Sequence, residues 1–242
     1  MSFIHLRVAS AYSFKYGTTQ PRDLVARASE LEMPALALTD RDGLAGAIRF
    51  TKAAVAHGIA PIIGVNLAIR IGDTSGALPR VTVLAHGDGG WRSLVRLMTG
   101  LQMNSPDRTP VLTPELLEKF SSYTSQLHLL HGPESPVSQA LTAHRFDAAL
   151  TIFNQTRDLF ADHAIECVSH LAPGNGPRST AHAARSLIFA RDNDINAVLT
   201  NAVRMCHRDD GPVADVLDCA RQLVPLHPRH VERRNAEGYL KS

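Results

Sequence analysis

The sequence lacks a long apolar run. Its longest apolar stretches, "PALAL" and "APIIGVNLAI", have the length of a β-strand, whereas a helix that crosses a bilayer needs about 20 consecutive apolar residues. The first residues also lack the basic stretch, apolar segment and small-residue cleavage site of a secretory signal. The sequence therefore predicts no membrane partner and a cytoplasmic location.

The sequence also contains few cysteines and has almost no excess of one sign of charge. The three cysteines, Cys167, Cys206 and Cys219, show no CxxC spacing, so neither a disulfide framework nor a zinc-ribbon site is predicted. Lysine and arginine number 25 against 23 aspartates and glutamates, a net charge of +2. Such a balance provides no electrostatic footprint for nucleic acid or for a membrane surface.

Apolar residues make up 44% of the 242 residues, which is enough for a substantial core. Strand-like runs alternate with helical periodicity. The predicted strands are an opening strand at residues 3–8, followed by 34–40, 60–69, 80–85, 126–132, 164–170 and 195–201. The predicted helices begin at Pro21 and near Leu44, include Trp91, and lie around residues 134–161, 178–193 and 211–223. Seven strands that are mostly followed by helices require parallel pairing, in an open doubly wound sheet or in a closed barrel.

Polar residues lie where these strands end. His5 and Arg7 share one face of the opening strand, and Asp40, Arg41 and Asp42 follow the second strand. Further polar residues at strand ends are Asn66, His131, Glu166, His170, Asn201 and Arg204. Histidines and carboxylates at one edge of a sheet would suit a hydrolytic metal site. The arginines oppose that interpretation, because a guanidinium has no lone pair to donate to a metal.

Six segments together resemble a known family. They are "HLRVASAYSFKYG", "PALALTDRDGLAGAIRF", "GIAPIIGVNLAI", "VTVLAHGDGGWRSLVRLM", "LTNAVRM" and "NAEGYLKS". In this order and spacing they resemble the PHP (polymerase and histidinol phosphatase) domain of bacterial DNA polymerase III alpha subunits, in particular the error-prone-like type. The resemblance implies an α/β fold, a distorted seven-stranded (β/α) TIM-like barrel that holds up to three metals on nine ligands in intact members.

The nine ligand positions are largely changed in this sequence. By resemblance, the metal-site positions are His5, Arg7, Tyr16, Arg41, Asn66, Arg80, Pro133, Ala202 and Arg204. Only His5 keeps the residue type of the family, so the resemblance implies a degenerate metal site in which His5 at most would bind a metal. Four of the replacements are arginines. We hypothesise that they substitute for the metals and pair with Asp40, Asp42 and Glu166.

The resemblance also implies a function. Residues 1–225 would form the PHP domain, and residues 226–242 would begin the connection to a polymerase region. The parent would be a DNA-directed DNA polymerase, a nucleotidyltransferase of replication or repair, with Mg²⁺ in its polymerase region. This segment would contain no catalytic residue, need no cofactor, and serve as a structural and interaction module.

The expected partners are the rest of the polymerase chain, a proofreading exonuclease subunit, and DNA through the parent enzyme. Two alternatives remain open. One is a stand-alone metal-dependent phosphoesterase of the PHP superfamily. The other is a module that binds phosphate or a nucleotide through its arginines.

Overall fold

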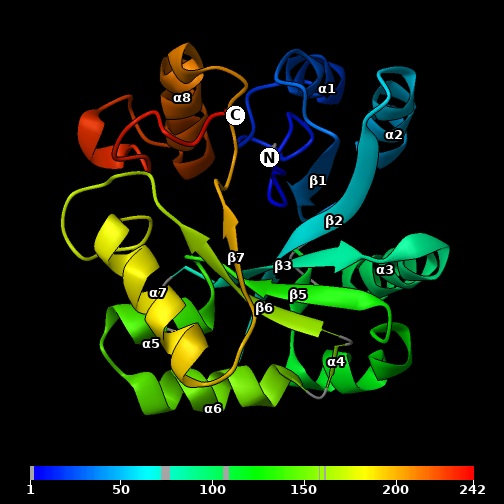
Figure 1. Cartoon of the computed structure of the whole chain (residues 1–242), viewed down its shortest axis with the longest axis vertical. Helices are drawn as coiled ribbons and strands as arrows, with labels where there is room; N and C mark the ends of the chain where they lie inside the picture. Colours follow the sequence, from blue (N-terminus) through cyan, green and yellow to red (C-terminus); the bar gives the residue numbers. More distant parts are fainter. Residues whose placement is uncertain (1–2, 72–76, 106–108, 158, 161) are drawn as a thin grey trace. The chain divides into compact units, whose positions relative to one another are not determined.

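The computed structural model describes residues 3–71, 77–105, 109–157, 159–160 and 162–242, and Figure 1 traces the chain from its N-terminus to its C-terminus. Contacts divide the chain into two compact units that alternate along the sequence. The first unit consists of Met1–Ile63, His170–Ala172 and Thr200–Ser242, and the second of Gly64–Ser169 and Pro173–Leu199. The domain boundary expected at residue 225 stays a prediction.

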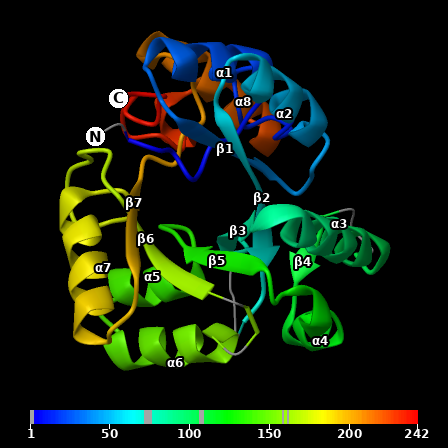
Figure 2. The same cartoon turned by 45° about the vertical axis from the view of Figure 1, so that its right-hand side comes forward.

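The first unit packs helices around a central strand. It contains α1 (Pro21–Glu30), β1 (Ala35–Arg41), α2 (Ala47–Ala56), the start of β2 (Ala60–Ile69) and α8 (Gly211–Gln222), with two short 3₁₀ helices, η2 (Arg208–Asp210) and η3 (Pro228–His230). Helices α1 and α2 pack against each other and against β1 (Figure 2). Their buried side chains form one apolar core that includes Leu24, Leu36, Phe50 and Leu240.

The predicted opening strand is wrong as a regular strand. Among the described residues before α1, Val8 alone takes part in a bridge, which is parallel to Val203. The segment still lies beside β1, because Ala37 N donates to the carbonyl of His5 at 3.0 Å. At Val8, however, the backbone N–H donates to Thr39 Oγ1 at 3.0 Å instead of to a carbonyl. A side chain therefore takes a place in the hydrogen-bond ladder that a regular strand would need.

The second unit surrounds the remaining strands with helices. It contains β3 (Arg80–Ala85), α3 (Gly87–Met103), β4 (Val111–Leu112), α4 (Pro114–Lys119), η1 (Ser121–Tyr123), β5 (Leu127–His131), α5 (Pro136–Thr142), α6 (Phe146–Arg157), β6 (Asp162–Val168), α7 (Thr180–Asp192) and most of β7 (Ala197–Thr200). Helices α5 and α7 pack on β5 and β6, and α6 packs on α5 (Figure 1). Val137, Phe153, Ile165 and Phe189 lie in the core that they enclose.

The strands hydrogen-bond in the order β1-β2-β3-β5-β6-β7, with β4 beside β2, in a seven-stranded sheet. The predicted α/β class is confirmed, but the predicted parallel pairing throughout is wrong. Strand β3 is antiparallel to both β2 and β5, whereas β5 and β6 are parallel. Only residues 70–79 join β2 to β3, and a parallel crossover needs a dozen or more residues.

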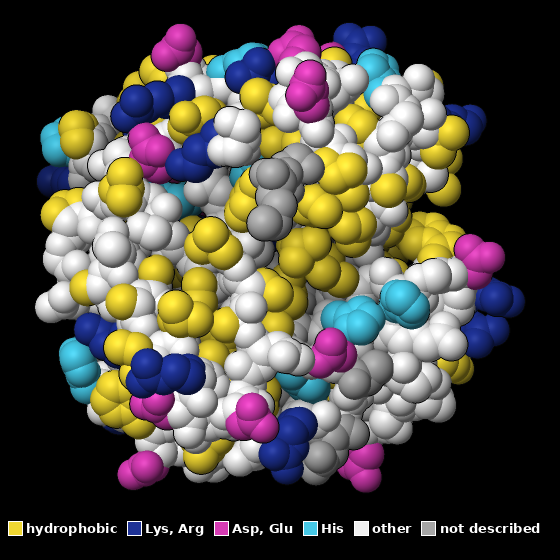
Figure 3. All heavy atoms as spheres, in the orientation of Figure 1, with side chains coloured by type: hydrophobic (Ala, Val, Ile, Leu, Met, Phe, Trp, Pro, Cys, Tyr) yellow, Lys and Arg dark blue, Asp and Glu magenta, His cyan; other side chains and the backbone are white. Residues whose placement is uncertain are grey.

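The surface carries charges of both signs. On the face drawn in Figure 3, basic and acidic side chains are interspersed among apolar ones, as the balanced composition predicts. Within the described ranges, no helix is both long and apolar enough to cross a membrane.

One histidine is buried in the core of the second unit. His131 Nε2 lies 3.3 Å from Thr156 Oγ1, and this hydroxyl donates to the carbonyl of Phe153, so it accepts the Nε2–H of His131. Nδ1 has no hydrogen bond among the described residues. Burial, together with the neighbouring His163, lowers the pKa of His131 to about 3. The ring is therefore neutral in the folded chain at pH 7.

Because His131 is buried and neutral, we predict that the free energy of unfolding of the chain decreases in mild acid. Between the folded pKa of about 3 and the unfolded value near 6.5, the unfolded chain binds one more proton at His131 than the folded chain does. Stability is then present above pH 6.5 and declines as the pH falls, by up to about 1.4 kcal/mol per pH unit. Urea titrations from pH 4 to 7 measure this slope.

His131→Gln keeps a donor for Thr156 and has no titrating group, so the slope should become shallower than in the wild type. His57→Gln is the matched control, because His57 is exposed and is solvated in both states. Equal slopes for the wild type and His131→Gln would contradict the prediction.

Candidate functional site

The nine expected ligand positions are divided between the two units. His5, Arg7, Tyr16, Arg41, Ala202 and Arg204 lie in the first unit, and Asn66, Arg80 and Pro133 lie in the second. The contacts of these residues are described below for each unit by itself.

His5 is fully buried in the first unit. Its Nε2 lies 2.7 Å from the carbonyl oxygen of Lys241, so Nε2 carries the proton and donates it to that carbonyl. Burial lowers the pKa of His5, and the ring is neutral. Nδ1 has a free lone pair and no hydrogen bond among the described residues. His5 could therefore offer a metal one nitrogen.

The other positions do not supply the remaining ligands. Within the part of the chain that the structure describes, no three His, Cys, Asp or Glu side chains lie close enough together to hold a metal ion. Ala202 has no donor atom in its side chain and takes a left-handed backbone with φ +46°. Pro133 is buried in the turn before α5. These residues do not fit a multi-metal site.

Three guanidinium groups surround the buried ring of Tyr16. The Cζ atoms of Arg41, Arg204 and Arg221 lie 3.3, 4.2 and 5.8 Å from the ring centroid. The carbonyl oxygen of Tyr16 also accepts hydrogen bonds from Nε and Nη2 of Arg204, at 3.2 and 3.0 Å. The face of an aromatic ring attracts cations. The ring of Tyr16 therefore stabilises three neighbouring guanidinium groups that would otherwise repel each other.

Asp218 on α8 neutralises part of this charge. Its Oδ1 lies 2.8 Å from Arg204 Nη2 and 3.1 Å from Arg221 Nη2, and its Oδ2 lies 3.2 Å from Arg204 Nη1. The exposed fractions of the Arg204 and Asp218 side chains are 4% and 0%. Burial alone would lower the pKa of Arg204, but Tyr16 and Asp218 raise it overall. The residues Tyr16, Arg41, Arg204, Asp218 and Arg221 are called the Tyr16 cluster below.

Sequence reasoning missed Asp218 and Arg221. A usable signal was present, since the two residues have i,i+3 spacing on one predicted helix and a buried arginine needs an acidic partner. The pairing of arginines with Asp40, Asp42 and Glu166 stays a prediction. Glu166 is buried in β6.

Asp40 holds the loop that contains Tyr16. Its Oδ1 accepts from the backbone N–H of Ser10 at 2.6 Å and from the hydroxyl of Ser13 at 2.7 Å, and the Ser10 hydroxyl lies 2.9 Å from Oδ2. Burial raises the pKa of Asp40, and the hydrogen bonds from Ser13 and Ser10 oppose that rise. The loop is tightly folded, because a Cβ at Gly17 would lie 2.1 Å from the carbonyl oxygen of Ser10.

In the second unit, two of the expected ligand positions bind each other. Arg80 Nε donates to Asn66 Oδ1 at 2.6 Å, and Arg80 Nη2 donates to the carbonyl of Asn66 at 2.7 Å. Asn66 Nδ2 donates in turn to the carbonyl of Val81 at 3.2 Å. Asn66 and Arg80 stand near each other on the paired strands β2 and β3, so the sheet register brings them together.

Five of the nine positions thus contact one another in two groups. Tyr16, Arg41 and Arg204 form one group in the first unit, and Asn66 and Arg80 form the other in the second unit. In both groups the contacts join protein groups directly.

Comparison with known proteins identifies what these residues belong to. The PHP domain family matches residues 5–170. An error-prone DNA polymerase of Symbiobacterium thermophilum is 30% identical over 262 aligned positions, which cover 100% of this chain and 23% of that polymerase. The DNA polymerase III subunit alpha of Caulobacter vibrioides is 29% identical over 209 positions, with 83% and 18% covered. The chain therefore spans less than a quarter of the length of these relatives.

Solved structures support the fold. The structure of an amidohydrolase from Chromobacterium violaceum, with bound sulfate and no metal, has a TM-score of 0.54 and covers 83% of this chain and 87% of its own. Its sequence identity is 14%, so the likeness concerns the fold alone.

Removing one partner of the buried pair of Arg204 and Asp218 should destabilise the fold strongly. Arg204→Met leaves the fully buried carboxylate of Asp218 without its closest partner, and breaking a buried ion pair costs about 3–5 kcal/mol. We expect a loss of that size in the free energy of unfolding, measured by urea titration followed by circular dichroism.

Two further variants make this test specific. Arg208→Met removes an exposed arginine that pairs with Glu237 and should cost no more than about 1 kcal/mol. Arg204→Met combined with Asp218→Leu should cost less than the sum of the two single variants, because neither charge is then left alone. Strictly additive losses would contradict the coupling.

Proposed function

Because this chain belongs to the PHP domain family, we propose that it is the PHP module of a bacterial DNA polymerase of the alpha type, of the error-prone-like kind. In that enzyme it acts as a structural and interaction module that holds no metal and hydrolyses no phosphoester. Template-directed synthesis of DNA, with its Mg²⁺ ions, belongs to the polymerase region that the relatives have in addition.

The observation that carries the proposal is the direct contact among the expected ligand positions. Arg41 and Arg204 are fixed on Tyr16, and Arg80 is fixed on Asn66. A metal ion would need these places to present lone pairs, whereas a guanidinium presents only donors and a positive charge. His5 alone would be one ligand, which is too few for a cluster that polarises a phosphate and activates water.

The similar sequences support the proposal that the parent enzyme is a DNA polymerase. Both polymerases reported above match this chain over 83% or more of its length. The proposed partners are the polymerase region, a proofreading exonuclease subunit, and DNA through the parent enzyme. A stand-alone phosphoesterase and a phosphate-binding or nucleotide-binding module are the rival functions, and the experiment below separates them from this proposal.

The test combines metal content with hydrolysis. The purified chain is incubated with Zn²⁺ or Mn²⁺, desalted and subjected to elemental analysis, and is then assayed with p-nitrophenyl phosphate and with 3′-labelled DNA. We expect less than 0.1 metal ion per chain, as an order of magnitude for a site without a ligand set, and no hydrolysis above the blank.

The control separates a true activity from contamination. Stoichiometric metal, together with Mn²⁺-stimulated hydrolysis that His5→Ala abolishes, would overturn the proposal in favour of the phosphoesterase. Saturable binding of phosphate or of a nucleotide that Arg41→Met abolishes, without hydrolysis, would instead favour the binding module. Hydrolysis that persists in His5→Ala would come from a contaminant, and the proposal would stand.

A further inference from the structure

Helix α8 has an unusual distribution of polarity. Its inward face is formed by small residues and one acid, Gly211, Ala214, Asp218 and Cys219, all buried. Its outward face carries Val213, Val216 and Ala220, and Leu223 follows as the C-cap residue with φ +55°; all four are exposed. The spacing of three and four residues places the first three side chains on one stripe of the helix, and Leu223 lies at the C-terminal end of that stripe.

This arrangement is the reverse of what a free surface favours. A surface helix normally buries its apolar stripe and presents charged residues to water. Here the buried face holds the carboxylate of Asp218, which pairs with Arg204, while Val216 and Leu223 have exposed fractions of 52% and 86%. A continuous exposed apolar stripe marks a surface that another molecule covers.

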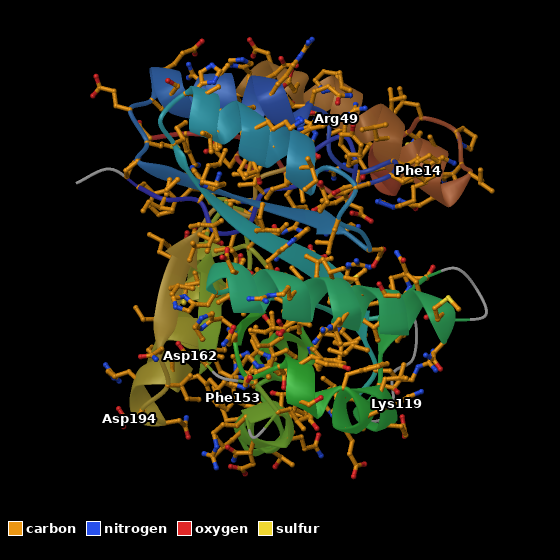
Figure 4. The ribbon with its side chains drawn as sticks, turned by 90° about the vertical axis from the view of Figure 1, so that its right-hand side faces the viewer. Phe14, Arg49, Lys119, Phe153, Asp162 and Asp194 are labelled. Carbon is orange, nitrogen blue, oxygen red and sulfur yellow. The ribbon has the colours of Figure 1, made fainter. Side chains whose placement is uncertain are left out.

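The loop of Tyr16 extends this stripe. Lys15 Nζ donates to the carbonyl of Ala220 at 3.1 Å, which fixes the tip of the loop at the C-terminal half of α8. The neighbouring residue, Phe14, is 80% exposed, and Figure 4 labels it beside the ribbon of the C-terminal part of the chain. Phe14, Val213, Val216, Ala220 and Leu223 are called the α8 stripe below.

The contacts of the Tyr16 cluster fix the loop of Phe14 and helix α8 to each other before any partner binds. Tyr16 lies two residues from Phe14 and is fixed by Arg204, which is itself paired with Asp218 of α8. The same ion pair therefore joins the loop to the helix. A surface that is already ordered loses little conformational entropy when a partner binds, and this favours affinity.

The segments covered by the family match and by the alignment with the error-prone polymerase indicate which partner binds the α8 stripe. The PHP domain family matches residues 5–170, so α8 lies outside that match. The alignment with the error-prone polymerase covers 100% of the chain and includes α8. The stripe therefore lies in a segment that aligns with a polymerase more than four times as long as this chain. The rest of such a polymerase is a candidate to cover the stripe.

We propose that the α8 stripe is the docking surface for an apolar face of the polymerase region, an inference that rests on the proposed function. The stripe is aliphatic apart from Phe14, which suits packing against protein better than stacking with nucleobases, for which aromatic and cationic side chains alternate. The nearby acid Asp215 is paired with Arg233 at 2.5 Å, so its charge is compensated beside the apolar surface.

The experiment measures binding between this chain and the polymerase region of the proposed parent enzyme, expressed as a separate polypeptide. Isothermal titration calorimetry gives the Kd. We expect the double variant Val216→Gln with Leu223→Gln to raise the Kd at least 10-fold. Hydrogen exchange of the wild-type chain should show protection of residues 211–223 in the complex, and this readout requires no variant.

The matched control is Ile48→Gln with Val55→Gln on α2. These two aliphatic residues of the same unit have exposed fractions of 59% and 67%, and their replacement should leave the Kd unchanged.

Binding that both double variants leave unchanged, with no protection of α8, would overturn the docking surface while the proposed function stands. Absence of a polymerase region, or of any binding by the wild-type chain, would overturn both. A dimer of this chain that Val216→Gln with Leu223→Gln dissociates would replace the polymerase region with a second copy.

Discussion

The buried ion pair between Arg204 and Asp218 is the interaction on which the organisation of the first unit depends. It joins the residues after β7 to α8, and the same guanidinium reaches the carbonyl and the ring of Tyr16 near the start of the chain. A loop near the start of the chain thereby meets two segments near residues 204 and 218 around one charge. A buried pair of this kind is not in itself a strong source of stability, but either charge alone would be costly. The pair therefore specifies one arrangement of these segments.

This constraint connects the candidate site to the surface. Because Asp218 faces inward, Val216 and Val213, two and five positions before it on α8, face outward at about 100° of rotation per residue. The loop fixed by Tyr16 presents Phe14 near the same helix through the bond from Lys15 to Ala220. The contacts of the Tyr16 cluster thus also shape the proposed docking surface. Arg80 and Asn66 satisfy each other in the second unit in the same way, without an ion.

Much of the fold could be predicted from the sequence, because local signals were strong. Pro21 marks the first turn of α1, and Gly58 follows α2 with φ +69°. The antiparallel pairings of β3 could not be predicted from β/α alternation, since they depend on the short connection after β2. The site positions followed from resemblance, whereas Asp218 required knowledge of which face of α8 is buried. Hydrophobic periodicity alone would have turned that face outward.

The central claim, that protein contacts stand where a metal cluster would be, is tested most directly by thermal unfolding under metal titration. A ligand at 100 times its Kd stabilises the folded state by about 2.7 kcal/mol, which would raise the Tm of a chain of this size by about 5–10 °C. The melting curve is recorded with EDTA and then with increasing Zn²⁺ or Mn²⁺. The account predicts that Tm stays constant within about 1 °C. A saturable rise of several degrees that EDTA reverses would contradict it.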